Sequence, residues 1–149
     1  NAEALNLIEE IRRLQGDSAF IGGKFAWPGE NTYVTSEFGM RLHPILKVNK
    51  LHTGMDIRAT LGSNVYAANG GTVIKAGWNN SYGNLVMIDH GGEIVTLYAH
   101  NSKLLVKTGD VVSRGQTIAL AGSTGSSTGP HIHFEVRVNG QYQDPRGWF

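Results

Sequence analysis

Two histidines separated by a single residue, His131 and His133, have a spacing that is frequent among metal ligands. They begin a stretch that alternates polar and apolar residues as far as Val138, which is the pattern of a β-strand with one face in the core. Residues two apart in a strand share a face, so both imidazoles lie on the polar face together with Glu135. Two imidazoles on one sheet face can bind the same metal ion, although an ordinary polar surface has the same pattern.

A second candidate pair, His52 and Asp56, lies in the segment from Leu51 to Ile57. Gly54 between them and Gly62 after them favour a loop that leads into a strand over a helix that would place both side chains on one face. An imidazole and a carboxylate are ligands that zinc accepts. Two unrelated surface residues would show the same spacing.

His100 is the third candidate, because it follows a predicted strand over residues 94–99. Alternation divides this segment into an apolar face and a polar face, with Val95, Leu97 and Ala99 on the first and Thr96, Tyr98 and His100 on the second. A lone histidine at a strand end fits a structural role as well as a catalytic one. Three separate segments that each place an imidazole on a polar face are harder to dismiss as structural together than separately.

The segments that must position these residues are typical of one mainly β domain. The chain has 149 residues, of which 40% are hydrophobic and 20 are glycine, and this length supports one core without disulfides or a structural metal. After residue 25, short period-2 segments are broken by glycine at intervals of roughly eight to twelve residues, which predicts a single antiparallel β-sheet domain. The predicted strands cover residues 33–35, 64–68, 71–76, 84–89, 94–99, 116–121 and 131–138.

The first residues follow a different pattern. Apolar residues recur at steps of three and four over residues 2–14, which predicts a short amphipathic helix. Gly16, Gly22 and Gly23 mark a linker, so we divide the chain into a helix with linker, residues 1–24, and a β domain, residues 25–149. The helix is either a coiled-coil remnant or a helix docked on the domain. A start at Asn1 instead of Met is typical of a processed or excised part of a longer protein.

The composition excludes several classes of function. Thirteen Lys and Arg against twelve Asp and Glu give a net charge of +1 without a basic stripe, so we expect no nucleic-acid partner. No apolar run approaches the roughly 18 to 20 residues that a membrane-spanning helix needs. The absence of cysteine excludes thiol nucleophiles, disulfide scaffolds and cysteine-based zinc sites.

The three candidate segments together resemble the lysostaphin/LytM-type zinc endopeptidases that act on peptidoglycan. The motifs that carry the resemblance are His52-x-x-x-Asp56, Tyr98-Ala-His100, Thr128-Gly-Pro-His131-Ile-His133-Phe-Glu135, Ser36 to Pro44, and Gly109 to Gly125. The resemblance covers residues 25–149 and implies one Zn²⁺ ion per chain, held by His52, Asp56 and His133. It also implies that the zinc lies in a groove over the sheet, and that His100 and His131 are catalytic residues that do not bind the metal.

The implied chemistry follows from this division. Three protein ligands leave a tetrahedral zinc one open position for water, whose pKa the metal lowers towards about 7. His100 and His131 would orient or deprotonate this water and protonate the leaving amine, and which of them is the base stays open. Glu135 is either a hydrogen-bond partner that orients a ligand or a solvent-facing residue. Weaker candidates for contacts in a substrate groove are Arg41, His43, Asn84 and Tyr98.

The resemblance implies zinc-dependent hydrolysis of peptide cross-links of bacterial peptidoglycan, at an extracytoplasmic location. The bond stays open between a glycyl-glycine bridge and a D-alanyl-diaminopimelate cross-link, because loop residues determine this choice. The expected partners are peptidoglycan stem peptides or cross-bridges, and a regulatory protein that acts through the N-terminal helix.

Two other classes of function compete with this one. A non-catalytic peptidoglycan-binding or amidase-activating module of the same fold would not need all five site residues, which are present. A biotinyl or lipoyl carrier domain is suggested by the segments 71–73 and 109–116, but a carrier needs a lysine at an exposed hairpin tip. Lys75 lies inside a predicted strand without the carrier motif.

Overall fold

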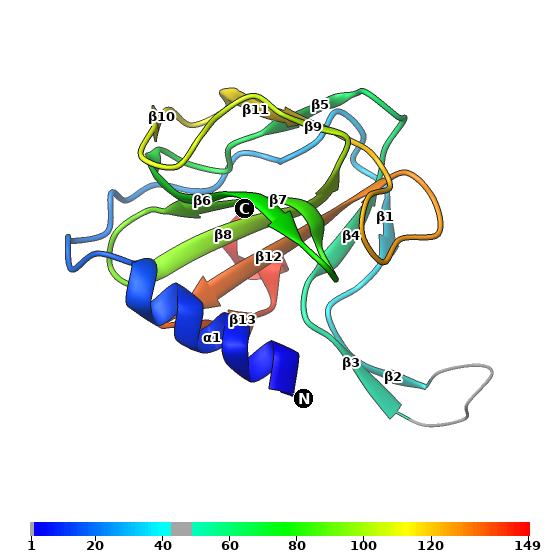
Figure 1. Ribbon diagram of the computed structural model, residues 1–149, viewed down its shortest axis with the longest axis horizontal. Coiled ribbons are helices and arrows are strands. Elements are labelled where there is room, and N and C mark those ends of the chain that lie inside the picture. The colour runs from blue at the N-terminus through cyan, green and yellow to red at the C-terminus, as the bar shows by residue number, and fades with distance from the viewer. Residues whose placement is uncertain (1, 43–48) are drawn as a thin grey trace.

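The computed structural model describes residues 2–42 and 49–149, with side chains described for residues 7–39 and 51–149. The strands pair antiparallel in three sheets, and one helix packs on the largest sheet (Figure 1). The prediction of a mainly β, antiparallel fold with an N-terminal helix is therefore confirmed, with the strands divided among three sheets where one was expected.

The large sheet has the strand order β1-β4-β12-β8-β7-β6-β10, and β13 pairs with the last residues of β12. Its strands are β1 (Val34–Ser36), β4 (Met55–Arg58), β6 (Gly71–Asn79), β7 (Gly83–Asp89), β8 (Ile94–Asn101), β10 (Val111–Val112), β12 (His131–Val138) and β13 (Gln141–Gln143). The three-stranded sheet, in the order β5-β11-β9, contains β5 (Asn64–Tyr66), β9 (Lys103–Leu104) and β11 (Thr117–Leu120). A separate pair is formed by β2 (Gly39–Leu42) and β3 (Asn49–His52).

All seven predicted strands are present, with bounds that differ by at most three residues. The strands for which no bounds were predicted from the sequence are β2, β3, β4, β9, β10 and β13, each of four residues or fewer. Alternation is not detectable over so few residues. A short 3-10 helix, Pro145–Trp148, was also missed.

The main core lies between the large sheet and the three-stranded sheet (Figure 1). Strand β12 contributes Ile132, Phe134 and Val136 to this core, as its alternation predicted. Val65 of β5 and Ile118 of β11 pack from the other side and have no exposed surface. Burial of each such side chain contributes about 1.5–3 kcal/mol, so this core accounts for the association of the two layers.

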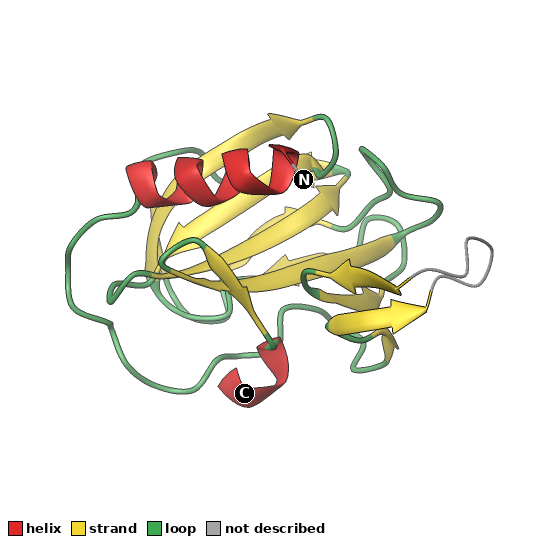
Figure 2. Cartoon of the chain, turned by 90° about the horizontal axis from the view of Figure 1, so that it is seen from below, coloured by secondary structure: helices red, strands yellow, loops and turns green. Residues whose placement is uncertain are grey.

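Helix α1 (Ala2–Leu14) covers the opposite face of the large sheet (Figure 2). Its apolar residues Leu7 and Ile11 are buried in a second cluster with Leu85 of β7 and Leu97 of β8. Helix α1 therefore leaves part of this sheet face uncovered, at the end of β12 that carries the histidines. No helix among the described residues is both long and apolar enough to cross a bilayer.

Polar contacts also hold the helix and its linker on the domain. Nε of Arg12 donates a hydrogen bond of 2.8 Å to the carbonyl of Asn139, just beyond the end of β12. The N–H of Gly16 donates to Oδ2 of Asp89 at 2.7 Å. In this chain the helix is thus docked on the sheet, and the division of the chain at residue 24 stays a prediction.

Candidate metal centre and catalytic cleft

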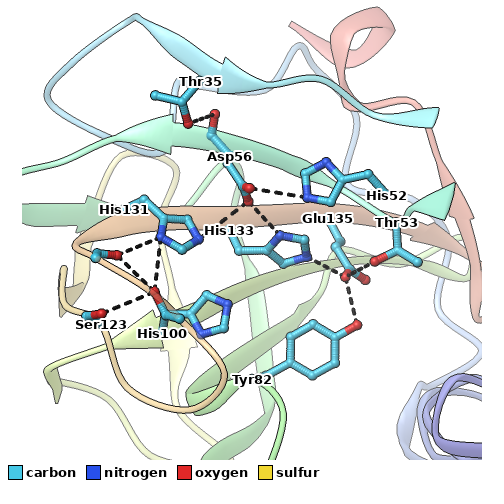
Figure 3. Close-up of polar contacts among 12 residues, drawn as sticks. Thr35, His52, Thr53, Asp56, Tyr82, His100, Ser123, His131, His133 and Glu135 are labelled. Carbon is cyan, nitrogen blue, oxygen red and sulfur yellow. Dashed lines mark hydrogen bonds and ion pairs between the residues drawn. The ribbon is translucent and has the colours of Figure 1, made fainter. Parts of the chain in front are cut away.

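A cleft of about 420 Å³ lies on the uncovered part of the sheet face (Figure 3). The structure brings all five predicted metal-binding and catalytic residues into its lining, namely His52, Asp56, His100, His131 and His133. The rest of the lining is uncharged and is rich in hydroxyl groups, from Thr53, Ser81, Tyr82, Ser126, Ser127 and Thr128.

Strand pairing positions Asp56 and His133. The two residues are directly opposite each other in the antiparallel pair β4–β12, so their side chains project to the same side of the sheet. The expected loop leading into a strand is present, since residues 53–54 lead into β4, which begins at Met55 and carries Asp56. His52, in contrast, is the last residue of strand β3 and does not lie in the loop.

Gly54, in the turn between β3 and β4, allows this turn to lie directly against β12. A Cβ at Gly54 would overlap the carbonyl oxygen of Phe134 and the side chain of Glu135. Any residue with a side chain would push the turn, and His52 with it, away from His133.

His52, Asp56 and His133 each offer one ligand atom, and these atoms lie within 4.8 Å of one another. Oδ1 of Asp56 is 2.9 Å from Nδ1 of His133, and Oδ2 is 3.3 Å from Nε2 of His52. Nδ1 of His52 donates a hydrogen bond of 2.8 Å to the carbonyl of Glu37, which leaves Nε2 free to bind an ion. Nε2 of His133 donates to Glu135 at 2.7 Å, so Nδ1, which faces Asp56, is the nitrogen that would bind an ion after losing its proton. Two neutral imidazoles and one carboxylate fit a zinc ion with one open position.

The charges of these groups are strongly coupled. Burial alone would raise the pKa of Asp56, but hydrogen bonds from His133 and His52 outweigh burial and hold this pKa well below its usual range. Burial alone would lower the pKa of His133, whereas its hydrogen bonds with Asp56 and Glu135 raise the pKa to about 9. In the metal-free protein Asp56 is therefore ionised and His133 is protonated at neutral pH, so a metal ion would displace a proton from Nδ1 of His133.

His100 and His131 lie beside this group of ligands. The rings of His100 and His131 are 4.9 Å apart, and His100 is 5.9 Å from His133, between ring centroids. Nδ1 of His100 donates to the carbonyl of Thr124 at 2.7 Å, and Nδ1 of His131 donates to the carbonyl of Gly129 at 2.9 Å. Nε2 of each imidazole is therefore the nitrogen that can accept a proton. Burial and the charges of the two neighbouring histidines lower the pKa of His100, which favours its neutral form.

The backbone of His100 explains an error in the predicted strand faces. His100 has a φ of 65°, in the left-handed region, so its side chain leaves the face that alternation assigned to it. It points instead towards His131 and His133 (Figure 3).

Tyr98 does not line the cleft, which corrects its prediction as a groove residue. It has no exposed surface and packs in the main core against Phe134. Its hydroxyl accepts a hydrogen bond from the N–H of Ala68 at 2.9 Å and is 2.6 Å from Oγ1 of Thr96. Both faces of β8 are buried, since the core covers one and helix α1 covers the other, so its polar face could not be assigned to solvent.

Asn84 supports the wall of the cleft without lining it. Its side chain donates to the carbonyl of Asn101 at 3.1 Å, and its N–H donates to Oγ1 of Thr124 at 3.1 Å. The loop 122–129 is thereby tied to the ends of β7 and β8. Arg41 lies in β2, and its side chain, like the whole of His43, falls outside the described residues.

Sequence reasoning left the role of Glu135 open and missed Thr53 and Tyr82. Glu135 is fully buried, and its Oε2 accepts hydrogen bonds from Thr53 at 2.7 Å and Tyr82 at 2.9 Å as well as from His133 (Figure 3). Oε1 accepts a hydrogen bond of 2.6 Å from Arg137, which is also fully buried. Burial would raise the pKa of Glu135, but the charge of Arg137 and the hydrogen bond from His133 lower it to about 2. Glu135 is thus an ionised partner of His133 and is shielded from solvent.

This fold and site are those of a family of metallopeptidases. Residues 50–145 match peptidase family M23, and the chain belongs to this family. The chain is 45% identical over 124 residues to the DD-carboxypeptidase/endopeptidase Mpg of Neisseria meningitidis serogroup B, a match that covers 83% of the chain and 29% of Mpg. It is also 45% identical over 114 residues to the peptidoglycan DD-endopeptidase ShyC of Vibrio cholerae, covering 76% of the chain and 26% of ShyC. The chain thus spans less than a third of these curated relatives.

Solved structures agree with this assignment. A zinc-containing peptidase from Vibrio cholerae superposes with a TM-score of 0.77 at 39% identity, over 83% of this chain and 39% of that one. The catalytic domain of lysostaphin from Staphylococcus simulans superposes with a TM-score of 0.70 at 36% identity, over 77% of this chain and 90% of that one. Zinc is therefore the metal that both the donor atoms and the relatives support.

Proposed function

We propose that this chain is a zinc-dependent endopeptidase domain that hydrolyses peptide cross-links of bacterial peptidoglycan. The observation that carries the proposal is the convergence of His52, Asp56 and His133 within 4.8 Å, with His100 and His131 beside them in one cleft. A non-catalytic module has no need for this complete set. The names of the relatives Mpg and ShyC support the same activity.

The chain's own groups account for the proton transfers of amide hydrolysis. A zinc ion held by His52, Asp56 and His133 would polarise the scissile carbonyl and make water more acidic. His100 and His131 present Nε2 to the cleft, so one can take a proton from water as its oxygen bonds to the carbonyl carbon. When the carbon–nitrogen bond breaks, that proton or one from the other imidazole goes to the leaving amine. The products are a carboxylate and an amine.

The lining of the cleft fits an extended peptide. The hydroxyl groups of Tyr82, Ser126, Ser127 and Thr128 line the cleft and can form hydrogen bonds with backbone amides. A DD-endopeptidase cuts between two D-configured centres, and a D-alanyl-diaminopimelate cross-link contains such a pair whereas a glycyl bridge does not. The relatives' names therefore favour the D-alanyl-diaminopimelate bond as the substrate of this chain.

Location and regulation follow from the substrate and from the helix. Because peptidoglycan lies outside the cytoplasmic membrane, an extracytoplasmic location is part of this proposal. A regulatory protein that acts through α1 would contact its exposed face, which carries Glu9 and Arg13, since Leu7 and Ile11 are already buried against the sheet.

The test is mass spectrometry of peptides released from purified peptidoglycan by the zinc-loaded protein, with a chelator-treated sample as the control. Walls with direct D-alanyl-diaminopimelate cross-links and walls with glycyl bridges are digested in parallel. We expect fragments with new D-alanine carboxyl ends from the first kind of wall, and none in the presence of the chelator. No release from either wall would contradict the proposal.

A further inference from the structure

Two neighbouring rows of residues cross strands β4 and β12 on the cleft face. In one row, Asp56 lies opposite His133, and their side chains meet at 2.9 Å. In the next row, Arg58 lies opposite His131. Directly opposite residues of an antiparallel pair project to the same side of a sheet, with Cα atoms about 4.5–5.5 Å apart. Arg58 therefore extends from the floor of the sheet beside His131, on the side of β1.

An aromatic ring orients Arg58. The N–H of Arg58 donates to the carbonyl of Tyr33 at 2.9 Å, and its Cζ lies 4.5 Å from the centroid of the Tyr33 ring. Tyr33 is 57% exposed, so the stacked pair faces solvent. Stacking reduces the freedom of the guanidinium and leaves its hydrogen-bond donors available at the edge.

Within the part of the chain that the structure describes, no carboxylate pairs with Arg58. Arg146, another exposed arginine, does have a carboxylate partner and contacts Glu37 through two nitrogens. An oriented guanidinium without an acid, next to a catalytic cleft with an uncharged wall, matches the requirements of a carboxylate-binding subsite.

The two candidate cross-links differ at the carbon that bears the leaving amine. In a D-alanyl-diaminopimelate cross-link, the carbon that bears the leaving amine also bears a carboxylate. In a glycyl bridge, the corresponding carbon bears only hydrogen besides the chain. A substrate whose scissile bond lies at His131 would place this carboxylate within reach of the neighbouring row, where Arg58 lies.

The geometry points to Arg58, held by Tyr33, as a subsite for the carboxylate next to the leaving amine, which selects D-alanyl-diaminopimelate cross-links over amidated or glycyl ones. This inference rests on the proposed endopeptidase function and assigns its choice of bond to one side chain. Arg58 binds the substrate and takes no part in the proton transfers.

The test compares two cross-linked peptide dimers that differ only in this carboxyl group, which is either free or amidated. The measured quantity is the ratio of kcat/KM for the free form to kcat/KM for the amidated form. For the wild type we expect a ratio of about ten or more, because one charge-assisted hydrogen bond to the free carboxylate accounts for a difference of this size. Arg58→Gln is expected to bring the ratio close to one, and Arg58→Lys and Tyr33→Leu to give intermediate ratios. Arg13→Gln, an exposed arginine on α1, is the matched control and should keep the wild-type ratio.

A second measurement makes the inference independent of turnover. The affinities of the two dimers for the zinc-loaded His131→Ala variant are measured by calorimetry, with and without Arg58→Gln. The inference would be overturned if the protein with Arg58 bound the free and the amidated dimer equally well. It would also be overturned if Arg58→Gln left the ratio of the two affinities unchanged. If the zinc-loaded wild type hydrolyses neither dimer, the proposed function fails, and the affinity ratio still decides whether Arg58 binds the carboxylate.

Discussion

Nε2 of His133 donates a hydrogen bond of 2.7 Å to Oε2 of Glu135, a carboxylate without any exposed surface. This contact keeps a proton on Nε2, so Nδ1, which faces Asp56, is the nitrogen that would exchange its proton for a metal ion. Arg137 contacts the other oxygen of Glu135 at 2.6 Å and balances its charge in the buried site. Glu135 thus fixes which ring nitrogen of His133 is available as a ligand.

Replacing Glu135 by Gln should weaken zinc binding and the fold together. Loss of this partner of a metal ligand costs about 10- to 100-fold in metal affinity. The buried charge of Arg137 loses its counter-charge, which lowers the free energy of unfolding by about 3–5 kcal/mol. Chelator competition and chemical denaturation measure the two effects. Tyr82→Phe removes only one of several donors to Glu135, so it should change the zinc affinity and the free energy of unfolding much less. Wild-type zinc affinity in Glu135→Gln would show that Glu135 does not orient His133.

The two proposed roles of the site histidines can be separated by metal analysis. His131→Ala and His100→Ala should lower the rate of hydrolysis by about 10²- to 10⁴-fold and keep one zinc per chain, because neither residue is a ligand. His52→Ala and Asp56→Ala should lose both the zinc and the activity. The measurements are zinc content after dialysis and the rate on a cross-linked peptide. Loss of zinc from His131→Ala would mean that ligand and catalytic roles are misassigned.

Gly54 should tolerate no side chain. Gly54→Ala would place a methyl group against the carbonyl of Phe134 and the side chain of Glu135, and such overpacking costs about 1–3 kcal/mol. The displaced turn would also carry His52 away from the other ligands, so zinc affinity should fall. Gly77→Ala is the matched control, since a Cβ there meets no atom within 4 Å. Equal zinc affinity and equal thermal stability in the two variants would contradict the packing argument.

His90, in the turn after β7, should make the fold sensitive to acid. Burial lowers its pKa below the ordinary value of 6.5, while its ring nitrogens contact the carbonyl of Gly70 and Oγ1 of Thr96 at 2.7 Å each. In the unfolded chain His90 binds a proton as the pH falls through about 6.5, whereas in the folded chain it stays neutral to lower pH. The free energy of unfolding therefore falls as the pH drops below 6.5. Above that pH His90 is neutral in both states, and its contribution to the stability of the fold is fully present.

The measurement is denaturation with a chelator present, at several pH values, for the wild type and His90→Gln. The variant should lose less stability than the wild type between neutral pH and about pH 5. Identical pH dependence of the two proteins would rule out His90 as the source of the effect.

Residue patterns predicted the strand that carries His131 and His133 and the side of it that enters the core, because eight residues show a clear alternation. They indicated a strand after Gly54 but not its position in the sheet, where β4 lies between β1 and β12 and aligns Asp56 with His133. This pairing joins segments far apart in the chain, and no local signal encodes it.

Patterns also failed where tertiary contacts decide burial. Glu135 and Arg137 occupy a polar strand face, and sequence reasoning could not tell that the face is covered. The left-handed backbone at His100 moves one catalytic candidate onto this same face, which no spacing argument anticipates. The combination of three motifs with a family resemblance nevertheless selected five residues that line one cleft, and their metal-binding and catalytic roles stay a prediction.

Zinc titration of the metal-free protein tests the central claim most directly. The protein is stripped with a chelator, and hydrolysis of a D-alanyl-diaminopimelate cross-linked dimer is followed as zinc is added. We predict that activity rises in proportion to zinc, stops rising at one equivalent per chain, and stays absent in Asp56→Ala. Full activity without zinc, or a rise in activity that Asp56→Ala shares, would contradict the account.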